Sequence, residues 1–233
     1  AAAYASQSSL FGQSLPTAKW ANQIGMELYT VRDLMETDFE GALAKLAALG
    51  YKEVEPANGY NNMSPKEFRA MLDRHGLTAP STHSQPTLGD GLEKELEGFQ
   101  IMGIKYTSVP TPPRPIVPGR KPGSGMLGEY FQGHNSFTQA EAFGPRQAPL
   151  TLAEAQRRAA ELNKYGKMGK KFGIKMLMHN HTGEFMPLTD APNRTEYDVY
   201  LKETDPELVA MQLDLGWATI AGQDIPAMFK ANP

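Results

Sequence analysis

The sequence predicts an α/β fold of the TIM (β/α)8-barrel type, of which this chain supplies about six strand–helix units. Short apolar runs alternate with helical patterns at intervals of roughly 25 to 30 residues, as expected of parallel strands joined by crossover helices. The strands are apolar at nearly every position, which is typical of strands covered on both faces. A doubly wound sheet also fits this alternation, but no G-x-G-x-x-G follows the first strand.

Each element is predicted from local signals. Ser64 with Glu67 and Thr151 with Glu154 have the spacing of helix capping boxes, and Gly76 ends the first of these helices. Strands are expected at 24–30, 52–57, 77–83, 104–110, 173–180 and 208–216. Helices are expected at 39–51, 64–76, 91–103, 151–171, 195–203 and 224–232.

Composition limits the function classes. The chain has 233 residues, of which 40% are hydrophobic, so it can bury one large core. Its net charge of -3 offers no strong positive field, so we expect neither a nucleic-acid partner nor an anionic membrane surface. No apolar run is long enough to span a bilayer. The absence of cysteine excludes thiol nucleophiles, thiolate metal sites and disulfides.

Two segments interrupt the alternating pattern. Residues 1–20 are small and polar, which fits either the remnant of a cleaved secretory signal or a disordered tail. The first alternative favours a periplasmic or secreted location over a cytoplasmic one. Residues 21–233 are expected to form one incomplete barrel domain with a Pro/Gly-rich insertion at 111–150. We predict that this insertion is a lid over the pocket, with a subunit contact or a mobile segment as alternatives. A homo-oligomer is left open.

Polar residues collect at the predicted strand ends, which meet around one mouth in a barrel. The oxygen ligands Glu184 and Asp214, with imidazole nearby, suit one divalent metal ion such as Mn, Mg, Co or Zn. Glu184, Glu55 and His181 are the candidate catalytic residues, with a carboxylate carrying the proton. A small-molecule carbohydrate is expected to contact Glu27, Tyr29, His83, Asn180 and Trp217.

A structural interpretation of "HNHTGEF" also exists. In it, His179, Asn180 and His181 satisfy buried backbone groups at a strand end. Alternation along the strand directs the two histidines to one side and Asn180 to the other. We expect His181 and Glu184 to face the pocket.

These motifs resemble the xylose isomerase-like TIM barrels of the sugar phosphate isomerase/epimerase superfamily. The similarity lies in the H-N-H-x-x-E-F strand end from His179 to Phe185, the L-D-x-x-W pattern at Asp214, and the sequences around Glu55 and His83. It covers residues 22–233 except the insertion. The resemblance implies that Asp214 is a metal ligand.

The chain departs from that family in two ways. The family barrel has eight strands, and its last strands carry two further metal ligands that have no counterpart here, so we expect this chain to be a fragment or to be completed by another chain. Some relatives have His three residues after the aspartate, whereas this chain has Trp217. This difference argues against simple aldose–ketose isomerisation.

The resulting function hypothesis is a divalent-metal-dependent isomerase or epimerase of a sugar or keto-sugar, acting through an enediolate. A keto-sugar lyase or hydratase on the same barrel is the nearest alternative. A non-catalytic sugar-binding barrel is a third. An abasic-site endonuclease on this barrel would need more metal ligands and a positive groove, and the five histidines and net charge of -3 argue against it. An unphosphorylated sugar is favoured because no Gly-rich phosphate loop is visible.

Overall fold

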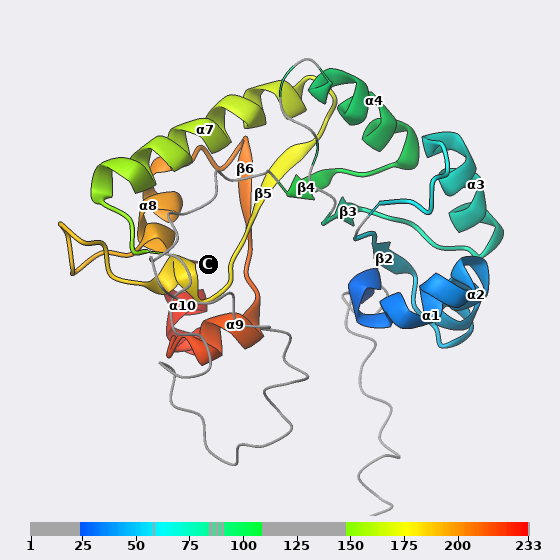
Figure 1. Cartoon of the computed structure of the whole chain (residues 1–233), viewed down its shortest axis with the longest axis horizontal. Helices are drawn as coiled ribbons and strands as arrows, with labels where there is room; N and C mark the ends of the chain where they lie inside the picture. The colour runs from blue at the N-terminus through cyan, green and yellow to red at the C-terminus, as the bar shows by residue number, and fades with distance from the viewer. Residues whose placement is uncertain are drawn as a thin grey trace, which may run out of the picture. The chain divides into compact units, whose positions relative to one another are not determined.

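The computed structural model describes residues 24–57, 59–83, 86, 89, 91–108 and 148–232. The chain divides into two compact units, one containing residues 1–84 and 101–104 and the other residues 85–100 and 105–233. Figure 1 labels their elements. The predicted 1–20 tail and almost all of the 111–150 insertion lie outside the described residues, so the lid stays a prediction.

The first unit contains the first two strand–helix repeats and the third strand. Its strands β1 and β2 pair in parallel, and residue 78 extends the pairing because Glu53 and Thr78 form a parallel bridge. Leu43, Phe68 and Leu72 are fully buried and form part of its core. The elements in chain order are β1 (Gly25–Glu27), η2 (Leu28–Val31), α1 (Arg32–Thr37), α2 (Phe39–Ala48), β2 (Glu53–Glu55), α3 (Pro65–Arg74) and β3 (Ser81–Thr82).

The second unit contains three parallel strands in the order β4-β5-β6. Helix α7 packs against β5 and α8 (Figure 1), and Gly166 and Gly169 give α7 its close approach to the sheet. The elements are α4 (Leu92–Met102, whose end belongs to the first unit), β4 (Tyr106–Ser108), α7 (Leu152–Lys170), β5 (Lys175–His179), η3 (Gly183–Phe185), α8 (Glu196–Glu203), β6 (Val209–Gln212), α9 (Leu215–Ile220) and α10 (Ile225–Ala231).

The helix starts follow the local sequence signals. Ser64 and Thr151 each accept a hydrogen bond from the backbone of a glutamate three residues later, and both capping boxes are present as predicted. The α/β class with parallel strands is also confirmed.

The described strands are shorter than predicted, above all at 77–83, where the strand is only Ser81–Thr82. Two of them end early for a reason that the structure shows. The first strand stops at Glu27, because residues 28–31 turn into a 3-10 helix that buries Leu28 and leads into α1. The sixth strand stops at Gln212, because the carboxylate of Asp214 caps α9 by accepting a bond from Trp217 N. Tyr29 and Trp217 therefore lie on helical turns rather than on strands.

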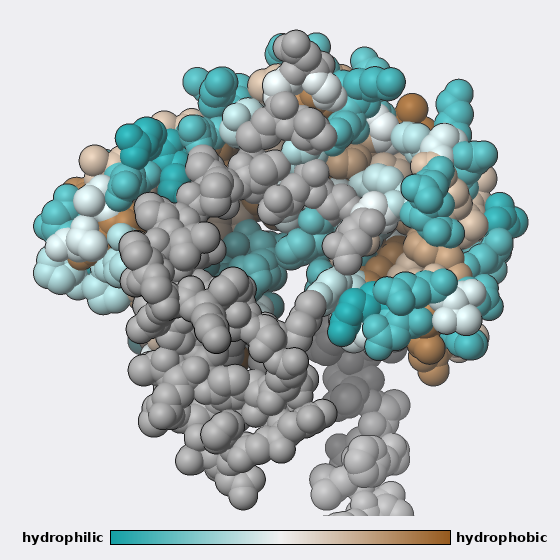
Figure 2. Space-filling model, in the orientation of Figure 1, coloured by the Kyte–Doolittle hydropathy of each residue, from teal (hydrophilic) through white to brown (hydrophobic). Residues whose placement is uncertain are grey.

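The outer helices carry much of the polar surface. The face seen in Figure 2 shows hydrophilic side chains over α2 and α3 mixed with hydrophobic areas. Leu34 and Leu49 are among the exposed large hydrophobic side chains of this unit. None of the helices in the described part of the chain is long and apolar enough to cross a membrane.

Candidate functional site

Three strand ends of the first unit place acidic and imidazole side chains together. Glu27 and Glu55 are direct partners in the parallel register of β1 and β2, so their side chains leave the sheet on the same face. His83 directly follows β3. Its backbone N donates to Pro56 O at 2.8 Å, which ties the residue after β3 to the residue after β2.

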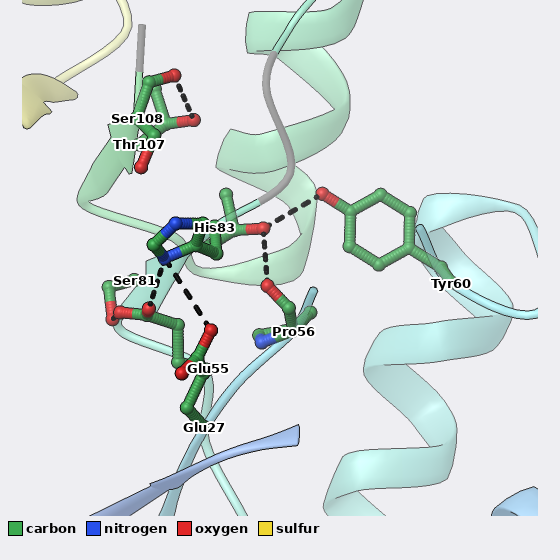
Figure 3. A network of polar contacts seen from close by, with 9 residues as sticks. Glu27, Glu55, Pro56, Tyr60, Ser81, His83, Thr107 and Ser108 are labelled. Atoms are coloured by element: carbon green, nitrogen blue, oxygen red, sulfur yellow. Dashed lines mark hydrogen bonds and ion pairs between the residues drawn. The ribbon is translucent and has the colours of Figure 1, made fainter. Parts of the chain in front are cut away.

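The three side chains converge (Figure 3). His83 Nδ1 lies 3.2 Å from Glu55 Oε1 and 3.6 Å from Glu27 Oε1. One ligand atom from each residue can be chosen so that all three lie within 4.8 Å of one another. Glu55 is the most buried of the three side chains, at 13% exposed, whereas Glu27 is 40% exposed. The cluster thus has a buried side and a side open to solvent.

Neighbouring polar groups hold this cluster in place. Ser81 Oγ donates a hydrogen bond to Glu55 Oε2, the oxygen that does not face His83. Thr82 Oγ1 donates to Pro56 O at 3.1 Å, and the Tyr60 hydroxyl lies 3.4 Å from Thr82 Oγ1. The ring of Tyr60 packs against Phe68, at a centroid distance of 5.1 Å. A chain of contacts therefore connects the cluster to the core of its unit.

The donor chemistry of the cluster fits a metal ion. Two carboxylates and one imidazole make a mixed oxygen and nitrogen set, which suits borderline divalent ions. Among the residues that the structure describes, Glu27, Glu55 and His83 form the group of this kind that could hold such an ion.

Tyr29 lies close in sequence to Glu27 but has its own contacts. The guanidinium of Arg32 lies over its ring, 4.5 Å from the centroid, and Arg32 Nη1 also donates to Tyr29 O at 2.9 Å. Arg32 therefore covers one face of the ring that we predicted for sugar stacking. The predicted sugar contact of Tyr29 stays a prediction.

In the second unit, Asn180 joins the ends of two strands. Its side chain is completely buried. Asn180 Oδ1 accepts a bond from Asp214 N at 2.8 Å, and Asn180 Nδ2 donates to Asp214 O at 3.2 Å. Asn180 thus satisfies buried backbone groups, as the structural interpretation of "HNHTGEF" expected. The predicted contact of Asn180 with a sugar stays a prediction.

The two carboxylates predicted as metal ligands both accept backbone hydrogen bonds. Glu184 Oε2 accepts from His181 N at 2.6 Å, and Asp214 Oδ1 accepts from Trp217 N at 2.7 Å. Each bond closes a turn and fixes the direction of a carboxylate. The metal-ligand roles of Glu184 and Asp214 stay predictions.

An aromatic row runs across the same strand ends. The ring of His181 lies 5.0 Å from the ring of His179 and 5.3 Å from that of Trp217, measured between centroids. The contact between the two histidines agrees with their expected placement on one side of the strand. His181 is exposed and Trp217 is half-buried.

The structure thus divides the predicted site residues between the two units. Glu27, Glu55 and His83 come together in the first unit, and Tyr29 lies on the following turn. Asn180, His181, Glu184, Asp214 and Trp217 lie in the second unit. The sequence prediction missed Ser81, although it stands two positions before His83 and strand alternation places both on one face.

Sequence comparison finds curated relatives named inosose dehydratase. One from Mesomycoplasma hyopneumoniae (strain 7448) is 26% identical over 210 residues, which cover 87% of this chain and 63% of the relative. Another, from Lacticaseibacillus casei, is 25% identical over 197 residues, covering 84% of this chain and 60% of the relative. The chain therefore spans less than two thirds of the length of these relatives. No family model matches the chain.

Structure comparison identifies the fold. A sugar phosphate isomerase/epimerase from Parabacteroides distasonis ATCC 8503 superposes with a TM-score of 0.62 and 22% sequence identity. The match covers 90% of this chain and 70% of the other protein. The parallel strands and crossover helices described above are therefore parts of a known barrel architecture.

Proposed function

Because the chain has the xylose isomerase-like TIM-barrel fold, we propose that it belongs to a divalent-metal-dependent enzyme acting on a keto-sugar or a cyclic keto-polyol. The group formed by Glu27, Glu55 and His83 is the observation that carries this proposal. The reaction begins with removal of a proton from the carbon beside the carbonyl. A hydroxyl group on the next carbon then leaves as water, so that the product is an unsaturated ketone.

The dehydration step is supported by the relatives in sequence, which are named inosose dehydratase. Inosose is a cyclic polyol with one carbonyl, so its name describes a substrate of the proposed class. The replacement of His by Trp217 at the third position after Asp214 also favours a reaction other than aldose–ketose isomerisation.

We assign the metal to Glu27, Glu55 and His83, whose oxygen and nitrogen atoms converge. A bound divalent ion supplies Lewis-acid polarisation of oxygen atoms on the substrate. Ser81 and Pro56 keep Glu55 and His83 in position through the hydrogen bonds described above. Held in this way, the three side chains need little rearrangement to accept an ion.

For the second unit, we propose roles in proton transfer and sugar contact. Glu184 is the candidate proton carrier, since a carboxylate can exchange a proton with carbon and the bond from His181 N to Oε2 fixes the direction of this one. Trp217 and His181 offer flat ring faces to the C–H side of a sugar ring. The net charge of -3 and the lack of a Gly-rich phosphate loop support an unphosphorylated, uncharged ligand.

An isomerase or epimerase is the second candidate, and the Parabacteroides distasonis structure with its name favours it. The first step is shared, because both reactions remove a proton next to a carbonyl. They differ afterwards, since an epimerase or isomerase returns the proton to carbon while a dehydratase loses hydroxide as water.

The test is a proton-exchange and elimination assay on the full chain with Mg²⁺ and inosose in deuterated water. NMR would follow loss of the signal from the carbon beside the carbonyl, and ultraviolet absorbance would follow the unsaturated ketone. We expect both signals in the wild type and a fall of more than about tenfold in Glu55→Gln. Glu184→Gln should lower exchange by about 10²- to 10⁴-fold.

The matched control is Glu40→Gln, which changes a glutamate that lies 3.1 Å from another histidine, His75, elsewhere in the first unit. Its rates should stay within about twofold of wild type, as expected of an exposed residue outside the site. Exchange without elimination would favour the epimerase candidate. Binding of inosose with neither signal would overturn the enzyme proposal in favour of a sugar-binding barrel.

A further inference from the structure

We propose that Ser81 sets the metal selectivity of the first unit, by limiting Glu55 to one ligand oxygen and so favouring Mn²⁺ or Zn²⁺ over Ca²⁺. This inference deepens the proposed function and depends on it only for the presence of a metal at Glu27, Glu55 and His83. The resulting site is assembled wholly from the ends of the first three strands.

The argument begins with the two oxygens of Glu55. Oε1 faces His83 Nδ1 at 3.2 Å, while Oε2 accepts the hydrogen bond from Ser81 Oγ. These two contacts hold both oxygens, and the Glu55 side chain is only 13% exposed. An ion beside His83 therefore meets Oε1, and binding through both oxygens would require breaking the bond to Ser81.

The backbone explains why Ser81 is in this position. Ser81 and His83 are two residues apart, and residues at this spacing on an extended strand share a face. The segment is fixed beside β2 at both ends, by Val54 N donating to Thr78 O at 2.9 Å and by His83 N donating to Pro56 O at 2.8 Å. Ser81 lies between these two attachments and next to Glu55.

A site limited in this way discriminates between ions. Ca²⁺ takes six to eight oxygen ligands and often uses both oxygens of a carboxylate. Zn²⁺ and Mn²⁺ accept imidazole together with carboxylate oxygens at lower coordination. One nitrogen and one oxygen from each of two glutamates therefore suit the transition metals, and water molecules can complete their coordination.

Calorimetric titration of the full chain with MnCl₂ and with CaCl₂ tests the inference. The binding event assigned to this site is the one that the Glu27→Gln, Glu55→Gln double variant no longer shows. In the wild type we expect this site to bind Mn²⁺ at least about 100-fold more tightly than Ca²⁺. Ser81→Ala should weaken Mn²⁺ binding about 10- to 100-fold and lower the ratio of the Mn²⁺ affinity to the Ca²⁺ affinity. Ser81→Thr keeps a hydroxyl, so it should restore both the Mn²⁺ affinity and this ratio.

The chain offers a matched control in Ser64→Ala. Ser64 Oγ donates to Glu67 Oε2 at 2.6 Å in the capping box of α3, so the same type of Ser–Glu hydrogen bond is removed away from the cluster. Its Mn²⁺ affinity should equal that of wild type once folding is verified by circular dichroism.

Equal affinity of the wild-type site for Ca²⁺ and Mn²⁺ would overturn the inference, even if Ser81→Ala did not fold. A folded Ser81→Ala variant with the same ratio of Mn²⁺ to Ca²⁺ affinity as the wild type would also overturn it. Selective Mn²⁺ binding without turnover of inosose would contradict the proposed reaction while supporting the selectivity of the site.

Discussion

At the scale of single residues, burial controls the chemistry of Tyr197. Its side chain is 4% exposed, and its ring lies 4.8 Å from that of Phe185. Desolvation raises the pKa of Tyr197 to about 12, because the charged phenolate is disfavoured away from water. The folded state therefore holds this proton more strongly than the unfolded state, in which tyrosine titrates near its ordinary value of about 10.

This difference predicts a loss of stability in alkali. The contribution of neutral Tyr197 is fully present below pH 10 and is lost as the pH rises through about 12. The Tyr197→Phe variant has no hydroxyl to ionise at this position. Between pH 10 and pH 12, the unfolding free energy of the wild type should therefore fall by about 2 kcal/mol more than that of the variant. Urea unfolding at a series of pH values measures this, and Tyr106→Phe, at a 38% exposed tyrosine, is the control. Parallel pH curves for wild type and Tyr197→Phe would refute the prediction.

At the scale of elements, Gly166 sets how closely α7 approaches the sheet. A methyl group at this position would lie 2.6 Å from Leu208 Cβ and 2.9 Å from Leu208 O. Both are closer than real contacts, and the carbonyl belongs to the backbone that leads into β6. The helix and the chain before β6 would have to move apart.

Gly166→Ala should therefore destabilise the protein by about 1–3 kcal/mol, although alanine is the better helix former by about 1 kcal/mol. The measurement is the shift of the urea unfolding midpoint. Gly91→Ala is the control, because a methyl group there meets nothing within 4 Å. A Gly166→Ala variant as stable as wild type would show that the close approach is not required.

A buried ion pair joins α7 to α8. Arg158 Nε lies 2.7 Å from Glu196 Oε1, with side chains only 10% and 1% exposed, and the Tyr200 hydroxyl bonds to both residues. Glu196→Leu removes the buried carboxylate that lies against the Arg158 guanidinium, so it should cost about 3–5 kcal/mol.

The double variant Arg158→Leu, Glu196→Leu should cost less than Glu196→Leu alone, since no uncompensated charge remains. The exposed pair of Arg69 and Asp73, at 2.6 Å, is the comparison, and Asp73→Ala should cost at most about 1 kcal/mol. Thermal or urea unfolding measures all three variants. A double variant less stable than the single one would contradict this account.

At the scale of the whole molecule, the two compact units should respond differently to a metal ion. Binding to the folded state protects the segments that hold the ion. We expect Mn²⁺ to slow hydrogen exchange in residues 24–31, 53–56 and 78–83, which contain or adjoin Glu27, Glu55 and His83. Residues 175–217 should exchange at unchanged rates. Protection centred on Glu184 and Asp214 instead would restore the ligand set that the sequence predicted.

Much of the fold follows from local sequence signals. The capping boxes at Ser64 and Thr151 were predictable, because the bonds of each box join residues three positions apart. The gathering of Glu27, Glu55 and His83 was predictable in part, because the ends of parallel strands meet on one edge. Their convergence within 4.8 Å could not be read from the sequence, since it depends on the register between strands.

The missed features depend on contacts over long sequence distances. The bonds between Asn180 and Asp214 span 34 residues, and the bond between Ser81 and Glu55 spans 26.

The turns after β1 and β6 were missed for a different reason. Their apolar residues, such as Leu28 and Leu215, suit either a strand or a short helix, and periodicity cannot separate the two over so few residues.

The direct pairing of Glu27 with Glu55 makes the site sensitive to chain length as well as to residue type. Because side chains alternate along a strand, deleting one residue within β1 would turn Glu27 toward the opposite face while leaving all three residues of the cluster in the sequence. Length changes in the turn around residues 59–63 would not shift that register. Insertions and deletions, as well as substitutions, therefore decide whether a variant of this barrel keeps the arrangement that we propose for an ion. A redesign that transplants the three side chains must also transplant the strand lengths.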